Sequence, residues 1–147
     1  MIQIVKMRET HVAAVAALEK ACFSLPWDEN SVRSELSNAL SLWLIAEEDG
    51  EVLGYVGSQT VLGESDMLNL AVREDQRRKG IGNALVVALC EALRAENSIS
   101  LTLEVRASNE AAKALYAAMG FETVGKRPRY YSRPVEDALI LRKELNR

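Results

Sequence analysis

The most constraining feature of the sequence is a long amphipathic segment in the middle of the chain. Its apolar residues recur at the three- and four-residue spacing of one helical face. They are Ile81, Ala84, Leu85, Ala88, Leu89, Ala92 and Leu93. Strands are predicted on either side, at residues 67–72 and 99–105, and apolar and polar residues alternate in the second one. A helix between two strands packs on a sheet, so the pattern predicts an α/β or α+β domain.

The rest of the chain predicts further elements around the same sheet. Thr10 is expected to cap a helix that reaches Cys22, and Asp28 to cap a second, short helix. Gly120 is expected to end a helix over residues 109–119. Strands are predicted at residues 2–6, 42–48, 52–61, 121–126 and 138–145, in the overall order β-α-α-β-β-β-α-β-α-β-β. With 147 residues and no repeat or linker, the chain is expected to form one domain, residues 1–147.

Composition excludes several classes of function. The net charge of −3 argues against general nucleic-acid binding. A single histidine, His11, and no His/Cys cluster leave no pattern typical of a metal site. Cys22 and Cys90 fall on apolar helix faces and are expected to be buried, reduced thiols. No stretch has the length of a membrane span, and the N-terminus lacks a signal-peptide pattern, so a cytoplasmic protein is expected.

A phosphate-binding pattern stands immediately before the central helix. Arg77, Arg78 and Lys79 precede Gly80-Ile81-Gly82. Glycines let a ligand approach the backbone, and the free amides of a first helical turn bind phosphate beside the positive end of the helix dipole. An ordinary solvated basic turn explains the same run equally well. A Rossmann fingerprint would need a third glycine where Leu85 stands, and a P-loop would need a lysine directly after Gly80.

Two further residues suggest proton transfer. Glu104 lies on the polar face of the strand 99–105, where a carboxylate can act as a general base, although a salt-bridged strand glutamate would look the same. Tyr116 lies at the edge of the apolar stripe of the helix 109–119. It suits either a proton donor or a half-buried core tyrosine.

Taken together, these residues resemble the GCN5-related N-acetyltransferase (GNAT) family. Its pyrophosphate-binding pattern, Gln/Arg-x-x-Gly-x-Gly/Ala, is met by Arg77, Gly80 and Gly82. The segment from Leu103-Glu104-Val105-Arg106 to Asn109, with Leu115-Tyr116 and Gly120-Phe121 after it, is similar to the RimI-type ribosomal-protein-alanine N-acetyltransferases within that family. Further matches are Pro26-Trp27, Tyr130-Tyr131 in the last loop, and Glu136-Asp137-Ala138. The resemblance spans the chain, but the first 65 residues, apart from Pro26-Trp27, match in pattern only.

The resemblance implies a fold, a cosubstrate and a mechanism. The fold would be a mixed, mostly antiparallel sheet with helices on both faces and splayed central strands. Glu104 would be the base and Tyr116 the acid in direct transfer from acetyl-coenzyme A, without a metal. The implied coenzyme-binding residues are Leu70, Ala71, Val72, Arg77, Arg78, Lys79, Gly80, Ile81, Gly82, Asn83 and Asn109. Trp27, Tyr130 and Tyr131 are the implied acceptor-binding residues.

The resemblance also implies the acceptor, the N-terminal alanine of a small-subunit ribosomal protein, and no direct nucleic-acid or membrane partner. An α-amine has a pKa of about 7.7–8.0, against about 10.4 for lysine, so a single carboxylate base suits it well. Acetylation of a small-molecule amine or a protein lysine stays open as an alternative, as does a coenzyme-binding module without activity. The oligomeric state is left open, a monomer included.

Overall fold

The computed structural model describes residues 1–132 and 134–146, which build one seven-stranded sheet. The strand order across the sheet is β1-β2-β3-β4-β5-β7-β6. The strands are β1 (Gln3–Lys6), β2 (Ser41–Glu48), β3 (Glu51–Val61), β4 (Glu64–Val72), β5 (Ser100–Arg106), β6 (Glu122–Tyr131) and β7 (Glu136–Glu144). The α-helices are α1 (Glu9–Cys22), α2 (Glu29–Ser34), α3 (Ile81–Ala95) and α4 (Glu110–Ala118). The order of helices and strands along the chain is the predicted one.

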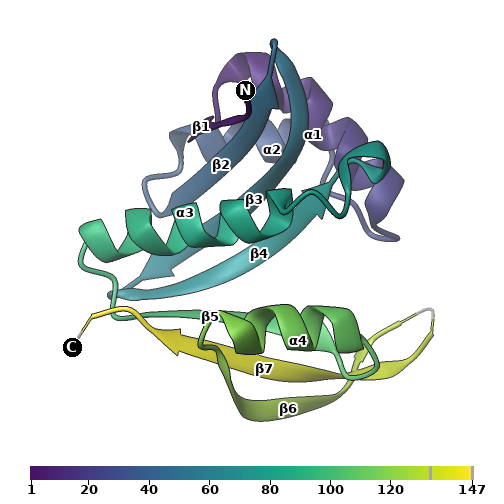
Figure 1. The fold of residues 1–147 in the computed structure, drawn as a ribbon, viewed down its shortest axis with the longest axis vertical. Helices are drawn as coiled ribbons and strands as arrows, with labels where there is room; N and C mark the ends of the chain where they lie inside the picture. Colours follow the sequence, from purple (N-terminus) through teal and green to yellow (C-terminus); the bar gives the residue numbers. More distant parts are fainter. Residues whose placement is uncertain (133, 147) are drawn as a thin grey trace.

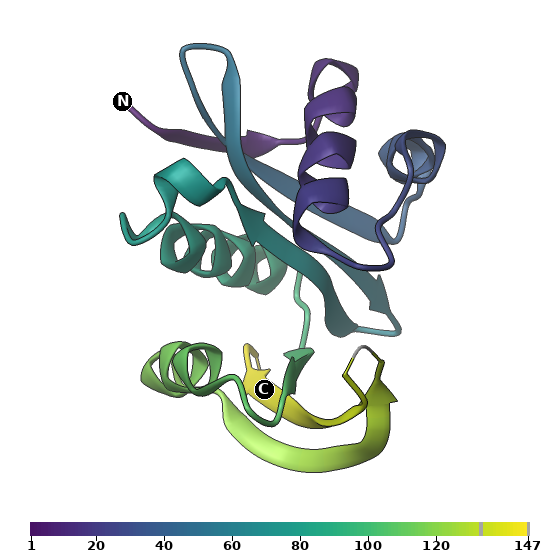
Figure 2. The ribbon, with the colours of Figure 1, turned by 90° about the vertical axis from the view of Figure 1, so that its right-hand side faces the viewer.

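Helices cover both faces of the sheet, as expected. Figures 1 and 2 show α1 and α2 on one face, and α3 and α4 on the other. Strand β2 contributes side chains to two hydrophobic cores, one on each face of the sheet. Trp43 and Ile45 pack with the residues of α1 and α2, whereas Leu44 and Ala46 pack with those of α3. Because successive strand residues point to opposite faces, a run that is apolar throughout belongs to a strand buried on both sides.

The centre of the sheet opens between β4 and β5. These two strands are parallel, and their neighbours in the sheet pair antiparallel. Their pairing covers only residues 64–66 of β4 and 100–102 of β5, after which the strands part. Figure 1 shows β5, β6, β7 and α4 set off from the half of the sheet that carries α3. The expected splayed central strands are therefore confirmed.

Two local predictions were wrong. Helix α1 begins at Glu9 with Arg8 as its N-cap, two residues before the predicted cap Thr10, because the Arg8 amide donates to His11 Nδ1 at 2.9 Å and holds the first turn there. Tyr130 and Tyr131 are not in a loop, since β6 continues through them and Tyr131 pairs with Glu136. The pairing of β6 is irregular between Arg127 and Tyr131, which bends the strand (Figure 2).

The cysteines differ in environment. Both are free thiols, but only Cys90 is buried, and Cys22 at the end of α1 is partly exposed. The prediction of buried thiols is confirmed for Cys90 and wrong for Cys22. Burial raises the pKa of the Cys90 thiol, which keeps it protonated and unreactive.

Candidate active site

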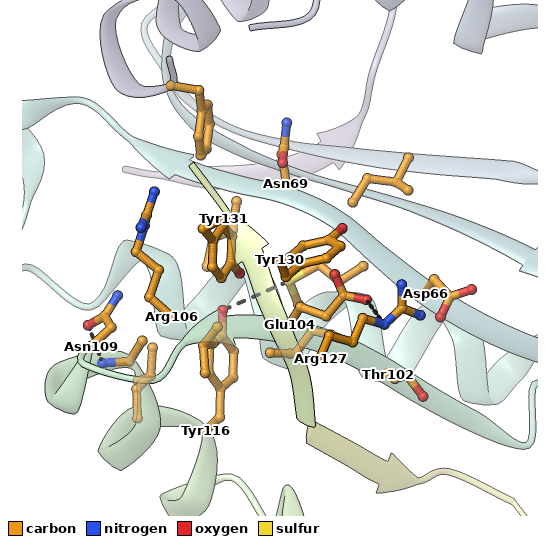
Figure 3. A pocket seen from close by; sticks show the side chains of 18 residues that line it. Asp66, Asn69, Thr102, Glu104, Arg106, Asn109, Tyr116, Arg127, Tyr130 and Tyr131 are labelled. Carbon is orange, nitrogen blue, oxygen red and sulfur yellow. Dashed lines mark hydrogen bonds and ion pairs between the residues drawn. The ribbon is translucent and has the colours of Figure 1, made fainter. Parts of the chain in front are cut away.

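A cavity of about 660 Å³ lies where β4 and β5 part. Figure 3 shows the side chains that line it. They come from both strands, from the end of α1, from α4 and from the bent part of β6. The lining residues are Phe23, Asp66, Met67, Leu68, Asn69, Leu70, Thr102, Leu103, Glu104, Val105, Arg106, Asn109, Ala112, Leu115, Tyr116, Arg127, Tyr130 and Tyr131. Glu104 and Tyr116, predicted separately from two elements, are thus brought to one cavity.

Glu104 presents its carboxylate to the cavity from the middle of the sheet. Leu103 and Val105, its neighbours on β5, are buried, and the Glu104 side chain keeps 24% of its surface exposed. Arg127 of β6 lies beside it, with 3.6 Å between Arg127 Nε and Glu104 Oε1. A carboxylate that is partly desolvated yet open to the cavity can accept a proton from a ligand there.

Tyr116 reaches the same cavity from α4, with most of its ring in the core. It is 5% exposed, and its ring packs edge-on against Phe121 with 5.4 Å between centroids. Its hydroxyl donates to Met67 Sδ of β4 at 3.8 Å (Figure 3). Burial raises the pKa of Tyr116 to about 12. The hydroxyl is therefore protonated at neutral pH and can donate a proton.

Two tyrosines and two arginines form the wall opposite β4. Tyr130 and Tyr131 meet edge-to-face at 5.1 Å. The guanidinium of Arg106 lies 4.5 Å from the Tyr131 ring centroid, and that of Arg127 lies 5.5 Å from the Tyr130 centroid. The pKa of Tyr130 is raised mainly by a hydrogen bond with Glu104. The pKa of Tyr131 is raised to about 12, mainly by burial. This wall is aromatic, and each of its two rings is in contact with an arginine guanidinium.

The start of α3 has the backbone geometry that an anion site requires. Gly80 is the N-cap in the left-handed region, with φ of 79°, and Arg78 before it has φ of 66°. The amides of the first turn have no partner inside the helix and point outward at its positive end. A Cβ at Gly80 would meet nothing within 4 Å, so the approach is open. Lys79 Nζ donates to Gln76 Oε1 at 3.2 Å, beside this turn.

Of the remaining predicted coenzyme residues, Leu70 and Asn109 line the cavity, whereas Ala71 and Val72 do not. Leu70, Ala71 and Val72 end β4 and pair with β3 on one side only. The Val72 carbonyl accepts a hydrogen bond from Arg77 Nε at 3.1 Å, which leaves it one lone pair. Asn109 is the N-cap of α4, and its Oδ1 accepts from the Ala112 amide at 3.1 Å.

Not every predicted residue reaches the cavity, and several unpredicted ones do. Trp27 does not line it; its ring packs edge-on against Trp43 with 5.4 Å between centroids. Phe23, Asp66 and Asn69 line it without having been predicted. Asp66 has no signal in the sequence, because it follows the polar residues Glu64 and Ser65 and lies just before the predicted strand 67–72.

Within the part of the chain described, no three His, Cys, Asp or Glu side chains are grouped to hold a metal ion. None of the helices in residues 1–132 and 134–146 has the length and apolar character needed to cross a membrane.

Comparisons with known proteins agree with this fold and this site. The family model described as "Acetyltransferase (GNAT) family" matches residues 12–121. The ribosomal protein bS18-alanine N-acetyltransferase of Escherichia coli K12 is 33% identical over 143 residues, 96% of each chain. That of Salmonella typhimurium is 35% identical over 135 residues, 90% of each chain. The crystal structure of the ribosomal-protein-S18-alanine N-acetyltransferase from Escherichia coli superposes with a TM-score of 0.92 at 32% identity, covering 100% of this chain and 96% of that one.

Proposed function

The chain belongs to the acetyltransferase (GNAT) family, and on that premise we propose that it acetylates the N-terminal α-amine of a protein, with acetyl-coenzyme A as the donor. We propose the N-terminal alanine of a small-subunit ribosomal protein as the acceptor, after the relatives named for that reaction. The observation that carries the proposal is the meeting of Glu104 and Tyr116 at the cavity between β4 and β5. Glu104 would serve as the base and Tyr116 as the acid of the transfer.

Glu104 would deprotonate the incoming ammonium, directly or through one water. The free amine then attacks the thioester carbonyl, so that a C–N bond forms as the C–S bond breaks. At neutral pH, removing a proton from an α-amine costs roughly 1 kcal/mol, against about 4–5 kcal/mol for a lysine side chain. Glu104 as the one proposed base, a carboxylate beside Arg127, suits the smaller of these costs.

Tyr116 would protonate the leaving thiolate. Its raised pKa keeps the proton on the hydroxyl until the thiolate develops. The nitrogen would lose its second proton to the tyrosinate as the amide forms, so that the reaction ends with an acetylated amine, free coenzyme A thiol and a restored Tyr116 hydroxyl, and no covalent enzyme intermediate is required. This agrees with the buried, protonated state of Cys90, which lies outside the cavity.

The coenzyme would lie across the face that carries α3 and α4. The amides of residues 78–83 would hold its pyrophosphate, with Arg77, Arg78 and Lys79 supplying positive charge. The free edge of Leu70, Ala71 and Val72 would pair with the amides of the pantetheine arm, as an added strand does. Asn109, at the start of α4, would contact the arm near Tyr116. Tyr130 and Tyr131 would then wall the acceptor entrance.

A panel of acceptors tests the proposal. Acetyl transfer would be measured by mass spectrometry on a peptide that begins Ala-Arg, on the same peptide with a blocked N-terminus and an internal lysine, and on polyamines and amino sugars. We expect the free α-amine peptide to react with the highest kcat/KM. Preference for the lysine peptide or for a small amine would contradict the proposed acceptor, while keeping acetyl transfer itself.

A further inference from the structure

Glu19 is a carboxylate buried completely inside the fold, on the last turns of α1. Burial of a charged group is costly unless hydrogen bonds replace its water. Glu19 belongs to neither proton-transfer role described above, and it does not line the cavity. Its hydrogen-bond partners therefore indicate what it does in the fold.

All of its partners are donors, which suits a carboxylate, an acceptor-only group. The Trp27 main-chain amide donates to Glu19 Oε1 at 2.9 Å. The Asn69 side-chain amide donates to Oε1 at 3.1 Å and to Oε2 at 2.9 Å. The Tyr55 hydroxyl donates to Oε2. One side chain therefore joins α1, the segment after it, β3 and β4.

One of these partners belongs to the wall of the cavity, and a second lies in a segment that reaches it. Asn69 lines it from β4, and its amide nitrogen points away from Glu104 (Figure 3). Trp27 lies in the segment between α1 and α2, whose first residue, Phe23, also lines the cavity. Leu68, next to Asn69, is the extra residue where the pairing of β3 and β4 shifts. Glu19 thus ties the α1–α2 segment to an irregular point of β4.

This wall lies on the acceptor side of the cleft. The face with α3 and α4 would take the coenzyme, so the face with α1 and α2 is left for the acceptor (Figure 2). We propose that Glu19 is a positioning residue that fixes the acceptor-binding wall through Asn69 and the α1–α2 segment. The inference rests on the proposed function, since it assigns the acceptor to this side of the cavity.

Glu35 provides a matched control. It is also buried and lies in the same layer of the molecule. It accepts hydrogen bonds from Ser41, Trp43, Gln59 and Asn38, at 2.9, 3.2, 3.1 and 3.1 Å, and none of these residues lines the cavity. Loss of either carboxylate weakens the fold, but of the two only Glu19 accepts a hydrogen bond from a residue that lines the cavity, Asn69.

The experiment compares E19Q with E35Q in steady-state kinetics on an Ala-Arg peptide. Glutamine keeps the size of the side chain, but its NH₂ group is itself a donor and cannot accept hydrogen bonds from the donors around it. We expect both variants to have a lowered Tm. E19Q should raise the acceptor KM on the order of 10-fold, with the affinity for acetyl-coenzyme A unchanged, and E35Q should leave both values near wild type.

A reversed hydrogen bond separates positioning from general loosening. In E19Q/N69D the glutamine amide donates to the new carboxylate, so the acceptor KM should recover at least in part. If E19Q does not fold, E19D takes its place, because a shorter carboxylate cannot reach both Trp27 and Asn69. An unchanged acceptor KM in E19Q or E19D, or an equal rise in E35Q, would overturn the inference.

Fluorine NMR distinguishes this failure from failure of the proposed function. The chain has two tryptophans, so 5-fluorotryptophan labelling yields two resonances. E19Q should shift or broaden the Trp27 resonance, and E35Q that of Trp43. If the wild-type protein acetylates no α-amine peptide, the proposed function fails, while a Trp27 resonance unaltered by E19Q refutes the role of Glu19 on its own.

Discussion

Replacing Tyr116 with phenylalanine separates a catalytic from a structural role. The ring is 5% exposed and packs against Phe121, and phenylalanine keeps both features. The substitution removes only the hydroxyl, whose partner in the described chain is Met67 Sδ at 3.8 Å. Sulfur is a weak acceptor, so the loss of stability is at most about 1 kcal/mol, or about 2–4 °C in Tm.

The expected loss of activity is larger. A coenzyme thiol with a pKa of about 8.5 is a fair leaving group, so an acid contributes less here than it would to an alkoxide. We expect Tyr116→Phe to lower kcat roughly 10- to 100-fold, which corresponds to about 1.4–2.7 kcal/mol in the barrier. Because the pKa of Tyr116 is raised to about 12, the ratio of wild-type to variant rates should stay constant at neutral and mildly alkaline pH.

Three measurements on Tyr116→Phe distinguish a catalytic from a structural role: thiol release in a colorimetric assay, acetyl-coenzyme A affinity by calorimetry, and Tm. Unchanged coenzyme affinity and a nearly unchanged Tm would show that the fold is intact. If kcat then equals that of the wild type, Tyr116 is a core residue and the proton must come from a bound water.

Substitutions at three further positions test other parts of the site. Glu104→Gln should lower kcat strongly at pH 7 with coenzyme affinity intact, and the loss should shrink as the pH nears the α-amine pKa of about 8; wild-type turnover at pH 7 would assign the base elsewhere. Gly82→Asp should abolish coenzyme binding by calorimetry, whereas Gly82→Ala should fold normally, since its Cβ meets only Val72 Cγ2 at 3.8 Å; coenzyme affinity unchanged in the aspartate variant would move the pyrophosphate away from α3. Burial and nearby Glu104 raise the pKa of Asp66, so its charged form disfavours the folded state above that pKa. Asp66→Asn should therefore raise Tm at neutral pH, with the gain vanishing as the pH falls below about 3.9, and a Tm gain independent of pH would contradict this cause.

The order of helices and strands was predictable because each element carries its own periodicity. The apolar stripe of α3 and the alternation of β5 depend only on local residues. The extent of β6 was not predictable. Pro128 and the charged residues around it do not give a strand pattern, and the strand continues there only because it pairs with β7. A strand held by its partner rather than by its own pattern cannot be read from one segment.

Glu104 and Glu19 show the same limit of prediction from sequence. Glu104 was predicted because a carboxylate on a central strand stands out against its apolar neighbours. Glu19 was missed because a glutamate on an amphipathic helix usually faces solvent. Its partners Trp27, Tyr55 and Asn69 lie 8, 36 and 50 residues away. Burial of a helical charge therefore depends on contacts that no spacing rule contains.

The parting of β4 and β5 connects the fold to the chemistry. Main-chain amides and carbonyls inside a protein are nearly always paired, and a strand edge that faces a cavity is an exception that a ligand can complete. Beyond Asp66 on β4 and Thr102 on β5, the pairing between these strands ends inside the sheet rather than at its rim. A ligand with its own amides, such as a pantetheine arm, can restore those hydrogen bonds. The carboxylate of Glu104, four residues into β5 from Ser100, then lies just past the last paired residue, where the opening begins.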